Sequence, residues 1–465
     1  SAERLDNTDG DGFKDADYYF GGEDDGAMTT GWLQMDVTYD EATNDYEIAP
    51  VFNEDEDQSR WFYFQSNGKK VKAKDGDVQK SKTINGKKYE FDQYGAMTAE
   101  WSLDVEKASK DGVRSGNSSS STNSVAAQYA KEWRYFNSVE DGSRISKGWF
   151  KVVGPNEDTS FKELDADTFA SDDAKNEDAR WYYNDGREEG LVAGKIKKIK
   201  GKYYGFRPDD GEKGGAMLKG LCALEMDGEN IVKVYDDDMD ADDLDDFLDG
   251  VDAGNYTANT YLYYFGNADD EDTDGAMKTG NVTVNLDGET IQFKFRNNGG
   301  AESRGRGVTG VEKGDYIYKF GKKIKADSED KYILVYASGD INSTGTVTVH
   351  DYDGSDVREL SGLLKGQSNA DDKGMTNVLY NFGTADQGWY LVNTSGKIQT
   401  GTKTGVKDGD DWYWYMKNGN IIMYTDSKDL GDGKIDGKNV GKNLKSNWNK
   451  TSMTSAKIAD FLDVK

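Results

Sequence analysis

The chain has 465 residues, and its 58 Lys and Arg against 87 Asp and Glu give a formal net charge of −29. Only 35% of the residues are apolar, yet 12% are aromatic, which excludes an ordinary disordered chain because such chains are poor in aromatics. We expect no nucleic acid or anionic membrane as a partner, since neutralising phosphates needs clustered Lys and Arg. No apolar run approaches the roughly 18 residues of a spanning helix.

Cysteine and histidine are each present once. Cys222 cannot form an internal disulfide, and His350 leaves no histidine-based zinc site. His350 lies in an apparent strand without identifiable catalytic partners, so we expect a structural role for it. The chain starts at Ser1 without the charged and apolar regions of a signal peptide, which favours a mature or trimmed chain.

Four copies of Gly-Ala-Met recur along the chain, each preceded by an aromatic strand. They are Gly26-Ala27-Met28, Gly95-Ala96-Met97, Gly215-Ala216-Met217 and Gly275-Ala276-Met277. Four residues after each Met stand Trp32, Trp101, Leu221 and Asn281. The third and fourth copies align without a gap over 21 residues, including Asp-Gly-Glu in both. The repetition predicts a repeat architecture.

The fourth copy shows what one repeat builds. Val282, Val284 and Leu286 alternate with polar residues, then Asp287-Gly288 turns the chain, and apolar residues alternate again up to Phe295. This pattern predicts a hairpin with a type I′ turn. A single hairpin is marginal in water, so stacked hairpins must bury the aromatic faces together.

A second kind of repeat begins with tryptophan. Its members are Trp61 to Phe64, Trp133 to Phe136, Trp181 to Tyr183, Trp389-Tyr390 and Trp412 to Tyr415. Most are followed by an Asn-Gly, Asp-Gly or Ser-Gly turn. Because residues two apart share a face of a strand, Trp61 with Tyr63 and Trp412 with Trp414 are expected to project side by side.

Three segments have helical spacing: 236–249, 356–364 and 455–462. We therefore expect a mostly β fold of stacked β-hairpin repeats, β-solenoid-like, with a few short helices in insertions and with two lobes left open. The predicted parts are N-terminal hairpin repeats over 1–114, a Ser-rich loop or linker over 115–131, central repeats with an acidic helical insertion over 132–350, and C-terminal repeats with short helices over 351–465.

The run from Tyr18-Tyr19-Phe20 through Gly26-Ala27-Met28 to Gly31-Trp32 resembles the cell-wall-binding repeats of Gram-positive surface proteins, a family that includes choline-binding and glucan-binding repeats. Lys147-Gly148-Trp149 and the strands at Trp61 and Trp181 match in part. The resemblance implies a solenoid of β-hairpins that binds choline or glucans with aromatics from neighbouring hairpins. The spacing is irregular and Leu221 and Asn281 replace tryptophan, so the repeats are degenerate. The acidic, aromatic-rich composition is also similar in style to non-catalytic starch-adherence proteins of gut Firmicutes.

Sugar recognition needs an aromatic face for the pyranose ring and polar groups for its hydroxyls, and Trp and Tyr supply large contact area. The same aromatics can instead form the stacking core of the hairpins. The candidate ligand-binding residues are Trp412, Trp414, Trp389, Trp181, Tyr183, Trp133, Tyr135, Trp61, Tyr63, Trp149, Trp101 and Trp32.

Asn7, Asp9 and Asp11 form the one weak metal candidate. They match the first ligand positions of a calcium loop, but the position of the closing Glu holds Tyr18. Calcium is thus the only cofactor to consider, and a solvated turn is the alternative.

No pair of carboxylates stands out as a glycosidase pair, so we expect no enzyme activity. The sequence predicts an extracellular, secreted or surface-attached protein that binds polysaccharide, an α-glucan such as starch or dextran. A choline-type cell-wall anchor and a structural or protein-binding adhesin are the alternatives. A larger cell-surface assembly is left open as a further partner.

Overall fold

The computed structural model describes residues 16–21, 25–37, 58–74, 80–91, 95–103, 133–138, 140–152, 179–186, 191–208, 214–266, 274–367, 377–428, 434–435 and 438–449. They divide into two compact units, residues 1–238 with 265–277 and residues 239–264 with 278–465. The predicted segment 115–131 and the predicted helix 455–462 lie outside the described residues. The boundaries given above for the four parts stay a prediction.

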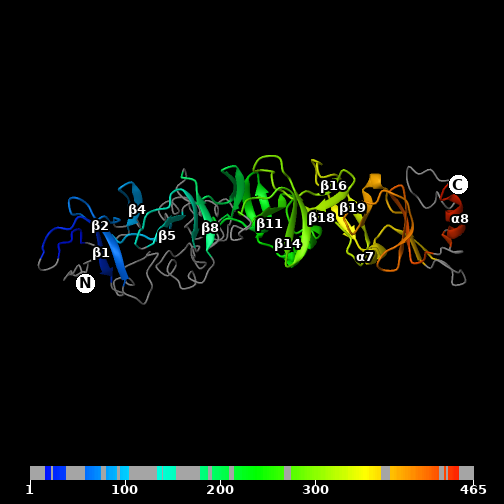
Figure 1. Ribbon diagram of the computed structural model, residues 1–465, viewed down its shortest axis with the longest axis horizontal. Coiled ribbons are helices and arrows are strands. Elements are labelled where there is room, and N and C mark those ends of the chain that lie inside the picture. The colour runs from blue at the N-terminus through cyan, green and yellow to red at the C-terminus, as the bar shows by residue number, and fades with distance from the viewer. Residues whose placement is uncertain are drawn as a thin grey trace. The chain divides into compact units, whose positions relative to one another are not determined.

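Unit 1 consists of antiparallel hairpins. Its strands are β1 (Gly31–Val37), β2 (Gln58–Phe64), β3 (Lys80–Ile84), β4 (Lys87–Phe91), β5 (Glu100–Leu103), β6 (Trp133–Phe136), β7 (Gly148–Val152), β8 (Arg180–Asn184), β9 (Lys195–Ile199), β10 (Lys202–Phe206), β11 (Gly220–Asp227) and β12 (Asn230–Asp236). The first eight pair in sequence as four hairpins, of which β1–β2 is the dark blue pair of Figure 1. The last four form a sheet in the order β10-β9-β12-β11.

Among its described residues, unit 2 contains larger antiparallel sheets and three α-helices. The elements are α6 (Ala241–Asp252), β13 (Thr260–Phe265, with the unit division after Tyr264), β14 (Gly280–Leu286), β15 (Glu289–Phe295), β16 (Gly310–Glu312), β17 (Tyr316–Lys319), β18 (Lys322–Lys323), β19 (Tyr332–Ala337), β20 (Val349–Tyr352), α7 (Gly354–Glu359), β21 (Leu364–Gln367), β22 (Asn377–Tyr380), η3 (Ala385–Gln387), β23 (Trp389–Asn393), β24 (Lys403–Lys407), β25 (Tyr413–Lys417), β26 (Asn420–Thr425), β27 (Lys434–Ile435), β28 (Lys438–Asn439) and α8 (Val440–Asn447). The sheets run β14-β15-β18-β17-β16, β20-β19-β23, β21-β22-β26-β25-β24 and β27-β28. The mostly β fold with stacked hairpins is thereby confirmed.

One backbone feature links successive hairpins. The Met of each Gly-Ala-Met copy forms an isolated bridge with the Phe that ends the preceding aromatic strand, as in Phe91 with Met97. The amide of Met97 also donates to the carbonyl of Trp61, 2.8 Å away in the hairpin before. Four further repeats make the same Phe- or Val-ended bridge with Lys70, Arg144, Gly307 and Ile398 in place of Met. The amides of Arg144, Met217 and Ile398 donate in the same way to the carbonyls of Lys88, Trp181 and Asp315, so these bonds connect successive repeats.

The side chains of Met28 and Met97 each pack against a glycine in the turn of the next hairpin. A Cβ at Gly68 would clash with the Met28 side chain, and a Cβ at Gly142 would clash with that of Met97. Both glycines have positive φ in the turn after an aromatic strand. Glycine is thus required at Gly68 and Gly142 both by the backbone conformation and by the close approach of a methionine.

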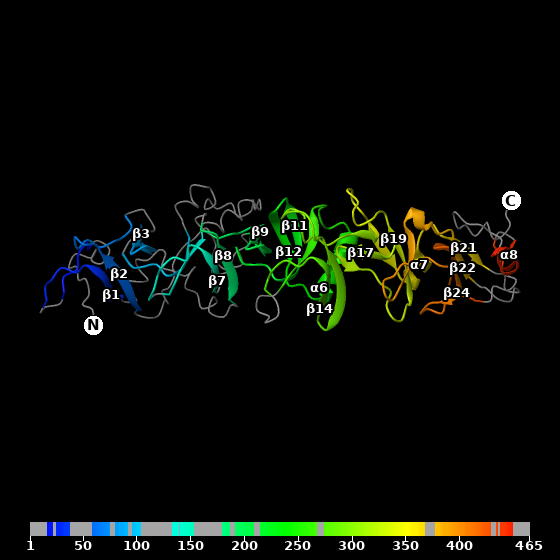
Figure 2. The same cartoon turned by 45° about the horizontal axis from the view of Figure 1, so that its top comes forward.

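The predicted hairpin over 282–295 is confirmed as β14 and β15, with Asp287 at φ 50° and Gly288 at φ 88° as a type I′ turn requires. The predicted acidic helix is α6, capped by Asp240, with Leu244, Phe247 and Leu248 buried. In Figure 2, α6 lies beside β14, and the Ala241 amide donates to the Asp287 side chain in the β14–β15 turn.

The predicted helix over 356–364 is α7, which begins earlier at Gly354 and ends at Glu359. No helix among the described residues is long and apolar enough to cross a membrane.

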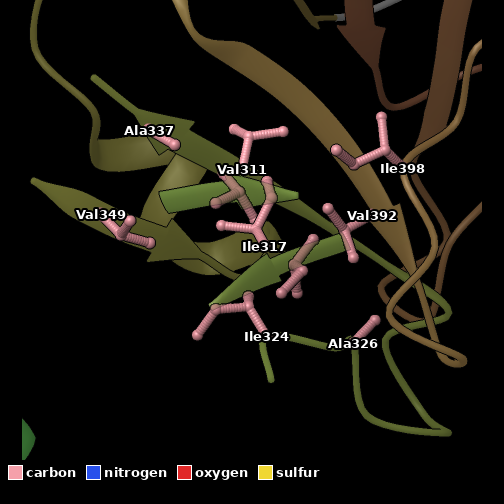
Figure 3. Packing of buried hydrophobic residues seen from close by; sticks show 10 residues of the cluster. Val311, Ile317, Ile324, Ala326, Ala337, Val349, Val392 and Ile398 are labelled. Carbon is pink, nitrogen blue, oxygen red and sulfur yellow. The ribbon is translucent and has the colours of Figure 1, made fainter. Parts of the chain in front are cut away.

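The cores are thin layers between stacked sheets. In unit 2 one cluster lies between β16–β17 and the sheet of β19, as Figure 3 shows for Val311, Ile317 and Val392. A second cluster lies on the opposite face of β19, where Leu334 packs with Leu391 and Trp414. Because Ile333 and Val335 belong to the first cluster and Leu334 to the second, β19 contributes side chains to both cores.

Candidate functional site

Trp32, Trp61 and Tyr63 form an aromatic corner in unit 1, named here the first corner. The β1–β2 register pairs Trp32 with Tyr63 and Gln34 with Trp61, which places the three rings on one face of the hairpin. The Trp32 ring is 6.5 Å from the Trp61 ring at an interplanar angle of 84°, and 5.1 Å from the Tyr63 ring at 65°. All three side chains are half-buried, so parts of perpendicular aromatic walls face solvent.

The next hairpin closes the back of the first corner. Tyr89 and Phe91 of β4 lie 4.9 Å and 5.8 Å from the Trp32 ring. Both are buried with Val71 and Met97. Trp32 is thus held against a neighbouring hairpin, as edge-to-face aromatic packing favours.

The same arrangement recurs at Trp149, Trp181 and Tyr183, named here the second corner. Trp149 lies 6.4 Å from Trp181 at 83° and 4.9 Å from Tyr183 at 56°. Tyr204 and Phe206 of the next hairpin lie 4.9 Å and 5.7 Å from Trp149. Two separate parts of the chain therefore reproduce five ring positions with nearly equal distances and angles.

Strands β5 and β6 repeat the backbone register of the two corners. Trp101 pairs with Tyr135, and Leu103 pairs with Trp133. The side chains of Trp101 and Trp133 lie outside the described residues, whereas Tyr135 stacks on Phe150 at 5.5 Å. By strand register, Trp101 and Tyr135 therefore correspond to Trp32 and Tyr63 of the first corner and to Trp149 and Tyr183 of the second.

Polar groups differ between the two corners. In the first corner the Trp61 indole N–H donates to Glu140 Oε2 at 2.9 Å, and the Gln34 amide donates to Glu140 Oε1 at 3.4 Å. These contacts are exposed, so the Glu140 carboxylate lies at the solvent-facing rim of the first corner. In the second corner the Trp181 indole N–H has no hydrogen-bond partner among the described residues.

Unit 2 carries a different aromatic surface, named here the platform: Tyr336, Tyr352 and Trp389. Tyr336 pairs with Trp389 across β19–β23, and Leu334 pairs with Tyr352 across β19–β20, so the three rings share one face of the sheet. The Tyr352 and Trp389 rings lie 6.2 Å apart at only 23°, and Tyr336 lies 5.2 Å from Trp389. All three are half-buried on a core that contains Leu334 and Leu391.

Charged groups lie at one side of the platform. Asp252, the last residue of α6, pairs with Lys319 at 2.7 Å and approaches His350 Nδ1 at 3.5 Å. Burial raises the pKa of the Tyr352 phenol, and the negative charges of Asp252 and Asp351 raise it further. Carboxylate oxygens and a protonated phenol, which can form hydrogen bonds with sugar hydroxyls, therefore lie next to the platform.

Tyr336 and Tyr352 were not among the sequence candidates. Their signal is the two-residue alternation of β19 and β20, where Tyr332, Leu334 and Tyr336, and His350 with Tyr352, share one face. Only the pairing of β19 with β23 reveals that this face continues to Trp389.

The pair Trp412 and Trp414 is corrected by the structure. Both rings lie on Tyr424, at 4.8 Å and 4.1 Å, so they do share a side. That side is a core, and Trp414 is 0% exposed. Trp412 keeps a half-buried ring, with the Arg358 guanidinium 5.5 Å from it. The pair forms no exposed platform, because Leu334 of β19, Leu391 of β23 and Val357 of α7 pack in the core that contains Trp414.

The calcium candidates Asn7, Asp9 and Asp11 lie outside the described residues. Within the ranges that the structure describes, no group of three or more His, Cys, Asp or Glu side chains is placed to hold a metal ion. Cys222 is buried, and burial first, then the charge of Asp237, raises the pKa of its thiol well above the ordinary value. Cys222 is thus a core residue rather than a nucleophile.

No protein-family model and no curated protein matches the chain. Among solved structures, choline binding protein F from Streptococcus pneumoniae is similar, with 16% identity, a TM-score of 0.37, and coverage of 87% of this chain and 88% of that chain. CbpJ from Streptococcus pneumoniae shows 15% identity, a TM-score of 0.30, and coverage of 83% and 96%. An alternansucrase in complex with isomaltononaose shows 13% identity, a TM-score of 0.19, and coverage of 82% and 23%. At identities and scores this low, these likenesses carry no argument about what this chain binds.

Proposed function

We propose that the protein is an extracellular, non-catalytic binding protein for surface or storage polysaccharide, with an α-glucan as the ligand of the platform. The observation that carries the proposal is the near-parallel pair Tyr352 and Trp389, at 23° and 6.2 Å. The two rings are nearly parallel and half-buried, and the exposed part of an aromatic ring is the kind of surface on which a pyranose ring stacks. Asp252 beside them supplies hydrogen-bond acceptors for ring hydroxyls.

The charge of the chain agrees with a neutral ligand. A net charge of −29 neither attracts nor repels a neutral glucan, so affinity must come from stacking and hydrogen bonds. Binding is accordingly expected to change little with ionic strength.

Trp389→Ala is expected to weaken α-glucan binding about 30-fold, a loss of about 2 kcal/mol, because it removes the larger ring of the platform. Retardation in native gels that contain amylopectin, dextran or no sugar measures the effect. Trp412→Ala is the matched control, since Trp412 is also half-buried in unit 2 but lies off the platform. Equal retardation of Trp389→Ala and the unchanged protein would remove the platform as the glucan site.

A second candidate function applies to the first and second corners, where we propose choline-type quaternary ammonium binding. The observation that favours it is the perpendicular Trp pair of each corner, at 84° and 83°, with a Tyr as a third wall. Aromatic faces that converge attract a cation through their quadrupoles, and Glu140 adds a negative charge at the first corner. Anchoring to a choline-bearing cell wall is the function that this geometry would serve.

Choline titration is expected to quench tryptophan fluorescence with a roughly millimolar midpoint, since each cation–π contact contributes only about 0.5–2 kcal/mol. The double variant Trp61→Ala with Trp181→Ala is expected to abolish most of the saturable signal, whereas Trp61→Phe with Trp181→Phe should retain part of it. A saturable response that survives in the alanine variant would place choline elsewhere, and no response in the unchanged protein would leave glucan binding as the sole proposal.

A further inference from the structure

A cationic groove lies in unit 1, lined by the chain that follows β2 and by the strand β3. Figure 2 labels β2 and β3. The groove measures about 700 Å³. It is lined by Asp17, Gln65, Lys69, Lys70, Val71, Lys72, Ala73, Lys74, Lys80 and Lys82. Six of these ten residues are lysines, in a chain whose net charge is −29. The net negative charge, from which we expected no anionic partner, therefore coexists with a local surface that is positively charged.

The sequence concentrates this charge. The segment 69–88 holds eight lysines and two acidic residues, Asp75 and Asp77. Alternation along β3 puts Lys80 and Lys82 on one face, toward the groove. Gathering like charges in one concave site costs free energy through mutual repulsion, so a bound anion would relieve that cost.

One carboxylate in the lining compensates part of the charge. Asp17 pairs with Lys69 at 3.2 Å and with Lys72 at 3.4 Å. Burial alone would raise the pKa of Asp17, but hydrogen bonds and charges from Lys69 and Lys72 outweigh it and lower that pKa. Asp17 therefore stays ionised and occupies two lysines.

The other lysines keep the groove positive. Lys70 is only 2% exposed, with its ammonium 6.0 Å from the Phe62 ring. Lys82 donates to the neutral amide of Gln65 at 3.3 Å. No carboxylate of the described residues pairs with Lys74, Lys80 or Lys82. Within the part of the chain that the structure describes, these three ammonium groups of the lining have no carboxylate partner.

We propose that this groove binds an acidic polysaccharide, a glycan polymer with regularly spaced phosphodiester or carboxylate charges. Lysine recognises either anion as a point charge, whereas the lining contains no Arg to impose bidentate geometry. Nucleic acid fits less well, because the lining offers no aromatic ring on which a base can stack. The groove shares Val71 with the core of the first corner, so a polymer chain seated here passes next to an aromatic site.

The test uses the full chain and the triple variant Lys74→Gln, Lys80→Gln and Lys82→Gln. The matched control changes three exposed lysines of unit 2 in the same way, Lys325→Gln, Lys428→Gln and Lys445→Gln. The probes are a glycerol-phosphate polymer, polygalacturonate, amylopectin and duplex DNA, with affinities measured by biolayer interferometry at several salt concentrations. The two anionic polymers distinguish phosphodiester from carboxylate as the source of charge.

The groove variant is expected to lose at least about tenfold in affinity for an anionic glycan, and the slope of log affinity against log salt is expected to fall by roughly three. The control variant should bind as the unchanged protein does. Equal losses in both variants, no binding of either anionic glycan at low salt, or tighter binding of DNA than of both would overturn the inference. Because amylopectin retention depends on Trp389 and not on these lysines, failure here is separable from failure of the glucan proposal.

Discussion

Trp414→Ala is expected to lower the local unfolding free energy of the β21-β22-β26-β25-β24 sheet by about 3–5 kcal/mol. The Trp414 side chain is fully buried, stacked on Tyr424 at 4.1 Å and tilted against Phe382 at 5.8 Å. Its removal leaves a cavity that the surrounding side chains, among them Phe382, Leu391 and Tyr424, can fill only in part. The loss should stay local, because stability in stacked repeats is a sum of unit and neighbour terms.

Hydrogen–deuterium exchange measured by mass spectrometry reports this change, since it resolves local opening free energies. Peptides from β25 and β26 should exchange much faster in the variant, and peptides from β14 and β15 should not change. Trp412→Ala is the matched control one residue outside β25, with a half-buried ring and a smaller expected loss. Comparable protection of β26 in both variants would mean that Trp414 is not the centre of this core.

Trp414 also shows why the sequence could predict the strand but not the role. Alternation correctly puts Trp412 and Trp414 on one side, but it cannot tell a solvent face from a core face. Here both faces are covered: Trp414, Tyr415 and Met416 are buried in succession, and all six residues of β26 are buried. A strand that is buried on both sides loses the polar alternation from which exposure is deduced.

The turns give a second example. Asp287-Gly288 forms the predicted type I′ turn, but the identical Asp227-Gly228-Glu229 string does not. There Asp227 pairs with Asn230, only Gly228 has positive φ, and the register shifts between Glu225 and Met226. A bulge in the flanking strands has moved the turn by one residue, and such a bulge leaves no local signal in the sequence.

The sequence also reveals only half of the isolated backbone bridges that follow the aromatic strands. Gly-Ala-Met marked four of them, whereas Lys70, Arg144, Gly307 and Ile398 make the same bridge without the motif. The bridge uses backbone groups, which every residue except proline supplies. The side chain at this position is therefore free to vary, and repeats without Met escape detection by sequence.

Arg134→Met is expected to destabilise unit 1 by about 3–5 kcal/mol near neutral pH, because it removes the stronger of the two arginine charges that stabilise the buried Glu90 carboxylate. Glu90 is 2% exposed and Arg134 is 8% exposed, and Arg134 Nη1 donates to Glu90 Oε1 at 2.9 Å. Ser81 donates to the same oxygen at 3.1 Å, which cannot replace a full charge. The pair joins β4 to β6, so its loss weakens the contact between two hairpins.

The effect of Arg134→Met on the unfolding free energy is expected to depend on pH. Burial raises the pKa of Glu90, and the charges of Arg134 and Arg144 and the bond from Ser81 offset only part of the rise. Between the ordinary pKa and the raised one, the folded state holds a proton that the unfolded state has lost, so the unfolding free energy falls as pH rises through that window. Arg134→Met removes the offset and extends the window upward, so the variant should recover stability as the solution is acidified until Glu90 is protonated.

Urea unfolding of the chain between pH 4 and 8 measures this pH dependence. Hydrogen–deuterium exchange of peptides from β4 and β6 reports the local loss of stability. The double variant Glu90→Gln with Arg134→Met should regain most of the loss, since neither buried charge remains. Lys87→Met is the control, because its pair with Asp141 is exposed and should contribute little. If Arg134→Met costs the same at every pH, Glu90 does not titrate in the folded chain, and the pair acts through packing alone.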